Sequence, residues 1–304
     1  RTIEHYESEQ PLFLKISFAR PHSPYDPPKR ILDLYQDIAM PVPAEGEWSK
    51  TIGLDCTDPK QEPDAAFAHF STEYVKNTRK HYYAAITFID EQVGRIVKVL
   101  KEKGMYENTL ICFTSDHGDM MGDHHHWRKT YAYEGSAAIP MIIKAPDNMK
   151  SMHNKGTFIE NPVELRDILP TFLDVAGVEV PDDMDGCSML KLVKEEKADW
   201  RRWIDLEHAT CYSEHNYWCA LTDGKIKYIW FLRTGEEQLF DLLKDPDEIQ
   251  NQVDNHAYKK ILEELRMAMV EHLSERGEDW VKNGKLQIRK KNMLYSPCYP
   301  PKKQ

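Results

Sequence analysis

A short apolar run that ends in an acid and an imidazole constrains this chain more than any other feature. Leu110–Phe113 is followed directly by Thr114-Ser115-Asp116-His117-Gly118. A continuous apolar run is typical of a strand in a parallel sheet that helices cover on both faces. Ligands of such open α/β sheets bind beyond the carboxyl ends of the strands. The pattern therefore predicts an α/β fold with a polar site at Asp116 and His117.

Strand and helix periods alternate along the chain up to about residue 200. The clearest helical period covers 86–100 and is followed by Gly104, a residue typical of helix C-termini. A second helix is predicted over 162–176, with Ile168, Leu169, Phe172 and Leu173 on its inner face. The segment 26–70 is rich in proline and aspartate and is predicted to be a long surface loop that lines the site. The predicted strands are 12–18, 109–115 and 139–144.

After about residue 200 the pattern changes to that of an antiparallel sheet. Residues 217–222 and 225–232 are strand-like and are separated by Asp223-Gly224, a strong hairpin signal. A further strand is predicted at 239–242, and 256–276 has the apolar stripe of an amphipathic helix. We therefore predict two parts: 1–200 in a mixed, mostly parallel α/β sheet flanked by helices, and 201–304 in a small antiparallel sheet with a packed helix.

Charge and composition exclude some classes of function. The formal net charge of the 304 residues is −10, which disfavours nucleic-acid binding. The sequence has no apolar run of the roughly 20 residues that a membrane span needs. Its six cysteines form no Cys-x-x-Cys pair, so a zinc ribbon is not predicted.

The candidate chemistry centres on four side chains. Asp116 and His117 are suited to bind a divalent cation, with Ca²⁺ favouring oxygen ligands and Mn²⁺ or Zn²⁺ accepting imidazole. Lys129 is placed to neutralise an oxygen of a sulfate or phosphate group. His22, framed by Pro21 and Pro24, is placed to contact the same anion or to protonate a leaving oxygen. The alternatives are an ordinary turn, a solvated lysine and a structural loop histidine.

Two other groups of residues leave alternatives open. The run His124-His125-His126 is either a metal cluster or a polar loop with at most one imidazole facing the site. The aromatic side chains of Trp127 and Tyr131 are available in principle to stack on a sugar, which would suit a non-catalytic carbohydrate-binding module.

Six blocks of sequence follow one another in a fixed order. They are Pro21-His22-Ser23-Pro24, 82–95, 108–118, 129–140, 167–171 with 185–188, and 238–251. In this order the blocks resemble the sulfatases (arylsulfatases) of the alkaline phosphatase superfamily. The resemblance implies an alkaline-phosphatase-like fold and hydrolysis of a sulfate ester of a sugar or an aryl group. It implies Asp116 and His117 as metal ligands, usually of Ca²⁺ with Mn²⁺ or Mg²⁺ as alternatives, and His22 and Lys129 as sulfate contacts.

One departure from the family pattern changes the activity that is expected of these 304 residues alone. The family nucleophile is a formylglycine made from a Cys or Ser in a Cys-x-Pro-x-Arg type motif, and no such motif occurs here. Cys298-Tyr299-Pro300-Pro301-Lys302 is superficially similar to this motif, but it lies near the C-terminal end of the sequence and lacks the arginine. The chain therefore resembles the C-terminal two thirds of a sulfatase, with the formylglycine and further metal-binding aspartates expected upstream, and we expect the fragment alone to be inactive.

Two further expectations follow from the resemblance. The main alternative activity is that of a phosphodiesterase or phosphonate monoester hydrolase of the same superfamily, since such enzymes share Asp-His-Gly. Family habit favours a periplasmic or secreted location. The sequence makes no prediction of oligomeric state.

Overall fold

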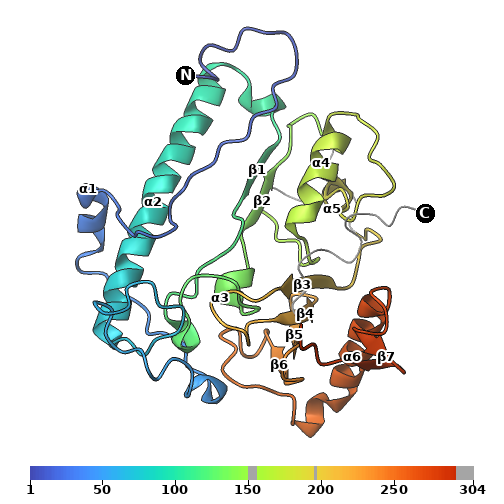
Figure 1. Cartoon of the computed structure of the whole chain (residues 1–304). Helices are drawn as coiled ribbons and strands as arrows, with labels where there is room; N and C mark the ends of the chain where they lie inside the picture. The colour runs from blue at the N-terminus through green and yellow to red at the C-terminus, as the bar shows by residue number, and fades with distance from the viewer. Residues whose placement is uncertain (150–155, 195–196, 292–304) are drawn as a thin grey trace.

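The computed structural model describes residues 1–149, 156–194 and 197–291, so that Cys298–Lys302 lies outside the described residues (Figure 1). Its helices are α1 (Lys29–Leu32), α2 (Thr72–Glu102), α3 (Glu134–Ala137), α4 (Ile168–Val175), α5 (Leu190–Lys194) and α6 (Lys259–Ser274). Its strands are β1 (Ile111–Thr114), β2 (Met141–Lys144), β3 (Ile204–His208), β4 (Trp218–Thr222), β5 (Ile226–Phe231), β6 (Glu237–Asp241), β7 (Val281–Lys282) and β8 (Lys285–Leu286).

The long helix α2 confirms the strongest helical period of the sequence and extends it toward the N-terminus. The Ser71 side chain accepts a hydrogen bond from the Tyr74 backbone N–H and so caps the first turn. Gly104, with φ of +66°, follows the last turn as the sequence predicts. The loop 26–70 contains only short helical turns and wraps the lower part of α2, where Arg30 pairs with Glu91 at 2.6 Å (Figure 1).

The strands predicted at 109–115 and 139–144 are present as β1 and β2, but they pair with each other in antiparallel fashion. Ile111 lies opposite Lys144, and Thr114 lies opposite Met141. The parallel neighbours that the continuous apolar run favoured are not found among the described residues. The predicted cover on both faces is also wrong for the described residues, since no residue of β1 is buried and Phe113 is 37% exposed. An apolar run fixes neither the cover of a strand nor the direction of its neighbour.

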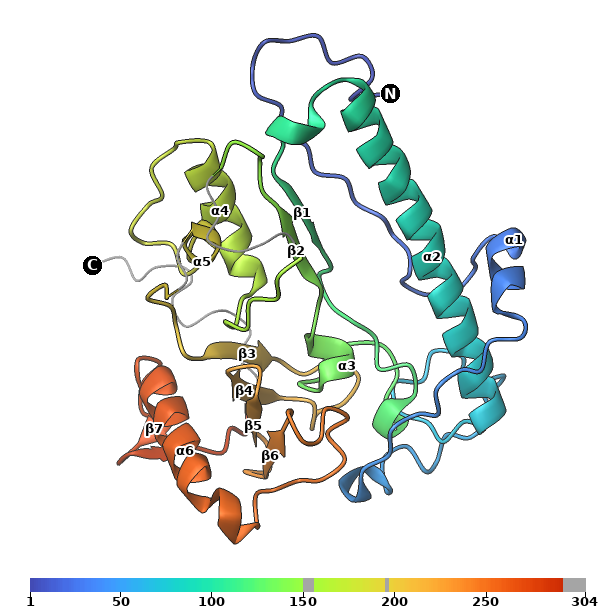
Figure 2. The same cartoon turned by 180° about the vertical axis from the view of Figure 1, so that it is seen from behind.

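The strand predicted at 12–18 is wrong as a paired strand. The segment is extended and runs between α2 and β1 in both views of the molecule (Figures 1 and 2), but it joins no sheet within the described residues. Its apolar side chains lie open to solvent, as shown by an exposed fraction of 73% for Phe13. Ile142 on β2 is likewise 60% exposed.

The C-terminal sheet is antiparallel, in the order β3-β4-β5-β6, and the predicted hairpin joins β4 to β5. Gly224 takes φ of +81° in the turn, a conformation that favours glycine. Helix α6 covers one face of the sheet, and its predicted apolar stripe is buried there: Leu262, Leu265, Met269 and Leu273. The sequence did not predict β3, the edge strand.

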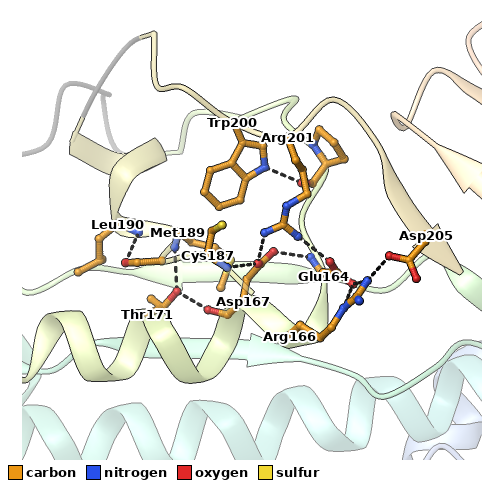
Figure 3. A network of polar contacts seen from close by, with 12 residues as sticks. Glu164, Arg166, Asp167, Thr171, Cys187, Met189, Leu190, Trp200, Arg201 and Asp205 are labelled. Carbon is orange, nitrogen blue, oxygen red and sulfur yellow. Dashed lines mark hydrogen bonds and ion pairs between the residues drawn. The ribbon is translucent and has the colours of Figure 1, made fainter. Parts of the chain in front are cut away.

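A network of ion pairs joins α4 to the segment before β3 (Figure 3). Asp167 is fully buried, accepts the Cys187 backbone N–H at 2.8 Å, and pairs with Arg201. A Cβ at Gly186 would lie 1.9 Å from the Arg166 carbonyl oxygen, so only glycine fits this approach. The block of the family resemblance formed by 167–171 with 185–188 thus holds this part of the fold together.

The predicted inner face of α4 is only partly correct. Leu169 is 54% exposed, whereas Pro170 and Thr171 on the same helix are buried. Thr171 is drawn into the interior by two hydrogen bonds, one to the Asp167 carbonyl oxygen at 2.6 Å and one from the Met189 N–H at 2.9 Å. Polar bonding to the network of Figure 3, rather than apolar period alone, therefore sets how this helix is rotated.

Candidate active site

The four side chains singled out in the sequence lie in one place. His22 Nε2 and Lys129 Nζ are 2.8 Å apart, although 107 residues separate them in the chain. The His22 ring packs edge to face against the His117 ring with 6.0 Å between centroids. His117 Nε2 is 3.8 Å from Asp116 Oδ2. The fold therefore brings two pairs, His22 with Lys129 and Asp116 with His117, to adjoining positions.

The rigid loop around His22 fixes which ring nitrogen carries a proton. His22 Nδ1 lies 2.8 Å from the Ser23 carbonyl oxygen, which only accepts hydrogen bonds. Nδ1 is therefore the protonated nitrogen, and Nε2 accepts a hydrogen bond from the Lys129 ammonium. Peptide bonds preceding Pro21 and Pro24 are both cis. Because the His22 ring is exposed, its Nε2 edge and the ammonium are both open to an incoming anion.

His117 and Asp116 carry free donor atoms of the kind that bind divalent cations. His117 Nδ1 donates to the Gly118 carbonyl oxygen at 2.6 Å, which leaves the Nε2 lone pair free. An imidazole held in this way by a carbonyl oxygen is the usual arrangement of a metal-binding histidine. The Asp116 carboxylate is 83% exposed and, among the residues that the structure describes, accepts only the His117 backbone N–H at 3.1 Å.

The two donors fit part of a metal shell but do not complete one. At 3.8 Å, His117 Nε2 and Asp116 Oδ2 are close enough to touch one cation after a small side-chain rotation. Within 1–149, 156–194 and 197–291, no group of three or more His, Cys, Asp or Glu side chains is arranged to hold a metal ion. A hard cation with six or more oxygen ligands would need further donors.

The loop that carries Lys129 has an unusual backbone. Five residues other than glycine take positive φ within ten positions: Met121, His124, His125, Arg128 and Thr130. Each such residue costs free energy, and clusters of them occur where surrounding contacts hold a functional loop in place. Here Asn216 donates to the Thr130 hydroxyl at 2.9 Å and Trp218 Nε1 to the Thr130 carbonyl oxygen at 3.1 Å.

Asp119 connects the two loops of the site. Its Oδ1 accepts the backbone N–H of Arg128 and of Met121, each at 3.0 Å. Its Oδ2 accepts the Tyr25 hydroxyl at 2.8 Å. Burial, together with this carboxylate, raises the pKa of Tyr25 above its usual value, so the phenol remains a donor. The carboxylate thus holds the His22 loop and the Lys129 loop together.

The three consecutive histidines serve the structure. His124 is buried against Trp48 and donates from Nε2 to the Asp247 carbonyl oxygen at 2.9 Å. His126 is buried among aromatic rings, and burial lowers its pKa to about 3. His125 stacks on His69 with ring centroids 3.5 Å apart. Of the two alternatives for this run, the structured loop is the one that the described residues support.

The aromatic side chains suggested for sugar stacking are buried, although Tyr131 contributes to the lining of a cavity. Trp127 and Tyr131 are only 5% and 4% exposed, because both pack into aromatic clusters. This cavity, of about 750 Å³, lies between the 48–55 loop and the C-terminal sheet, where Asn216 and Gln238 contribute polar groups. None of the four candidate site residues lines it, so this cavity is separate from the candidate chemistry.

The sequence did not reveal one buried charged group next to the site. Lys227, in the middle of β5, is fully buried and donates to Glu134 at 2.6 Å and to Glu248 at 2.8 Å. Lysine is almost never fully buried unless paired, so an isolated lysine between apolar residues gave no reason to expect this. The feature of the sequence that points to its burial is the position of Lys227 inside the apolar run 226–231.

Within the described residues, no helix combines the length and the apolar character needed to cross a membrane.

Comparison with known proteins places the chain in a family. The sulfatase family model matches residues 2–178, and a model described as the C-terminal part of N-sulphoglucosamine sulphohydrolase matches residues 122–275. An arylsulfatase from Clostridium perfringens is 39% identical over 280 residues, which is 92% of this chain and 57% of that protein. A choline-sulfatase from Rhizobium meliloti is 34% identical, over 82% of this chain and 48% of that protein.

A solved structure shows the same fold. The phosphonate monoester hydrolase of Agrobacterium radiobacter superposes with a TM-score of 0.71 at 25% identity, covering 88% of this chain and 58% of that one. The predicted alkaline-phosphatase-like α/β class with a small C-terminal antiparallel sheet is thereby confirmed, while the boundary at residue 200 stays a prediction. The chain spans about half the length of the curated relatives it matches. With more than half of its residues matched by the family model, the chain belongs to the sulfatase family.

Proposed function

We propose that the protein hydrolyses sulfate monoesters and that His22, Asp116, His117 and Lys129 belong to its active site. The observation that carries the proposal is the convergence of these four side chains, with His22 and Lys129 in direct contact at 2.8 Å. Two positive or protonatable groups at this spacing can touch the same oxygen of a transferred sulfuryl group. Such fixed donors lower the barrier by stabilising charge on that group as its ester bond breaks.

The roles follow from the free atoms of each side chain. Lys129 presents an ammonium that neutralises a non-bridging sulfate oxygen. His22 presents Nε2, which accepts a hydrogen bond from Lys129 in the resting state and, once protonated, donates to the sulfate or to the leaving oxygen. Asp116 and His117 would hold a divalent cation together with further ligands, for which we propose Ca²⁺. When bound, the ion supplies positive charge against the sulfate oxygens.

We propose a sulfated sugar or an aryl sulfate as the substrate. The family model matched at 122–275 is named for a sulfated amino sugar hydrolase, and one relative is an arylsulfatase. The nucleophile is a separate matter, because the sequence contains no Cys-x-Pro-x-Arg motif. Family members generally use formylglycine, and we propose that the full-length protein supplies one upstream of these residues.

The test is turnover by the full-length protein, with matched substrates. An aryl sulfate, an aryl phosphate diester and an aryl phosphonate monoester that share one leaving group should be compared at equal concentration, with and without added Ca²⁺. We expect the sulfate to have the highest kcat/KM. Phosphonate turnover above sulfate turnover would replace the proposal with the second candidate, phosphonate monoester hydrolysis, which the superposition with the Agrobacterium enzyme favours.

A further inference from the structure

A buried carboxylate from the C-terminal part of the chain holds the backbone that leads into the candidate site. Glu248 is 2% exposed, and each of its two oxygens has its own partner. Oε1 accepts from the Lys227 ammonium at 2.8 Å, and Oε2 accepts the backbone N–H of Glu134 at 2.6 Å. The same ammonium donates to the Glu134 side chain at 2.6 Å. Glu248 and Lys227 therefore fix the start of α3 through both the backbone N–H and the side chain of Glu134.

The position of Glu248 is fixed from several directions. Its backbone has φ of +55°, a conformation that a residue with a side chain seldom adopts unless other contacts enforce it. Trp48 Nε1 donates to its carbonyl oxygen at 2.9 Å, and His124 Nε2 donates to that of Asp247, also at 2.9 Å. Burial raises the pKa of the Glu248 carboxyl, and Lys227 opposes that shift. Without its partners this carboxylate would be a costly buried charge.

Helix α3 is in turn hydrogen-bonded to the two segments that carry the candidate site residues, the 116–118 turn and the end of the Lys129 loop. The Ser136 carbonyl oxygen accepts the Gly118 N–H at 2.8 Å, and the Ser136 hydroxyl accepts the Tyr131 N–H at 3.2 Å. A Cβ at Gly118 would lie 2.3 Å from the Gly135 carbonyl oxygen, so the two backbones are in close contact. Gly118 follows Asp116 and His117 directly, and Tyr131 lies two residues after Lys129.

In space, α3 lies between the end of β1 and the C-terminal sheet in both views (Figures 1 and 2). It has only four residues, too few to be stable by itself. Its position therefore depends on what it is bonded to, and the strongest of those bonds run to Glu248 and Lys227.

We propose that Glu248 is a positioning residue: its carboxylate, held by Lys227, fixes the first turn of α3, and α3 fixes the 116–118 turn and the end of the Lys129 loop. The effect on turnover rests on the function proposed above, whereas the effect on backbone order does not. Glu248 touches no substrate and acts only through α3.

The experiment compares the same Glu→Gln substitution at Glu248 and at Glu134, the two carboxylates that bind the Lys227 ammonium. Glu248→Gln replaces one of two occupied acceptor oxygens with an NH₂ donor, so one of its two bonds is lost. Glu134→Gln keeps an acceptor for Lys227 and leaves the backbone clamp intact. Glu237→Gln is the distant control, because Glu237 on β6 is bound by Tyr228 of the neighbouring strand β5 and by Arg266 of α6. All three are read out by amide hydrogen exchange of the full-length protein and by kcat and KM with an aryl sulfate.

For Glu248→Gln we expect exchange at Gly118 and Glu134 to accelerate about tenfold or more, with the Leu265 amide of α6 unchanged. In the same variant kcat should fall about 10- to 100-fold while KM stays within about twofold. Glu134→Gln and Glu237→Gln should leave exchange at Gly118 within about twofold of wild type. If Glu248→Gln does not fold, Glu248→Asp tests the same idea, because the shorter side chain keeps the charge and cannot reach both partners.

Unchanged exchange at Gly118 in a folded Glu248 variant would overturn the proposal, as would an equal acceleration in Glu237→Gln. Accelerated exchange in a full-length protein that hydrolyses no sulfate ester would instead leave the positioning role standing and remove the proposed function. The two failures are therefore distinguishable.

Discussion

The sheet formed by β3–β6 and the pair formed by β1 and β2 differ in how completely they are covered. All five residues of β4 are buried, and α6 closes one face of that sheet. In contrast, Ile142 of β2 is 60% exposed and Phe13 in the neighbouring extended segment is 73% exposed. The candidate site belongs to the exposed region, where Asp116 is 83% exposed. The contrast separates a well-covered part of the molecule from a more exposed part that contains the candidate site residue Asp116.

The largest expected effect is on turnover in the exposed region. Asp116→Ala in the full-length protein should lower kcat/KM for an aryl sulfate by about 1000-fold or more, since a proposed metal ligand is lost. The free energy of unfolding should change by less than about 0.5 kcal/mol, because the carboxylate is at the surface. Steady-state kinetics and urea unfolding measure the two. Turnover at the wild-type rate would remove Asp116 from the site.

A matched pair of truncations tests the contrast directly. Leu265→Ala, at a fully buried position of α6, should lower the free energy of unfolding by about 2–5 kcal/mol. Ile142→Ala removes a similar volume from an exposed position of β2 and should cost less than about 1 kcal/mol. Urea unfolding of both variants gives the comparison. A similar cost for the two would mean that Ile142 is covered in solution.

Next come the two sulfate contacts. His22→Ala and Lys129→Ala should each reduce kcat about 100-fold while leaving the urea midpoint close to wild type. A transition-state role predicts a change in kcat, whereas an increase confined to KM would indicate uniform binding of substrate. Lys129→Arg is the matched control, because it keeps the charge and changes the geometry.

The smallest expected effect concerns acid stability, and it belongs to the buried aromatic cluster. The pKa of His126 is about 3 in the folded protein and about 6.5 in an unfolded chain. The unfolded state alone binds this proton between those values, so the contribution is complete above pH 6.5 and is lost as the pH falls toward 3. Its slope approaches about 1.4 kcal/mol per pH unit.

Urea unfolding at pH 7 and pH 5 measures this loss. His126→Phe keeps a ring of similar size and should be less sensitive to the change in pH than wild type. The buried His124 has a lowered pKa for the same reason and should retain part of the sensitivity. Equal slopes for the two proteins would place the acid sensitivity in other groups.

Local signals predicted the elements of the covered region well. The Asp223-Gly224 turn fixed the hairpin, and the apolar stripe of α6 is buried as expected, because both depend on residues close in sequence. The segment 12–18 has the composition of a strand but lacks a paired neighbour, and pairing is a property of the whole fold. Leu169 faces solvent because hydrogen bonds from distant residues determine the orientation of α4.

The same reasoning explains what was found of the site. His22 and Lys129 were predicted to contact the same anion, and they lie 2.8 Å apart, although the strand predicted before His22 is not paired within the described residues. Glu248 was missed, because its partner Glu134 is 114 residues away and no local pattern marks a buried carboxylate. The catalytic roles themselves stay predictions.

The single carboxylate of Asp119, shared by Tyr25 and Arg128, has a consequence for how this protein can vary. Tyr25 and Asp119 are 94 residues apart, and the Asp119 carboxylate binds both the His22 loop and the Lys129 loop. Neither loop can therefore be lengthened or exchanged with a relative's loop without displacing the other. Specificity in this protein would therefore be expected to evolve, or to be engineered, by replacing both loops together.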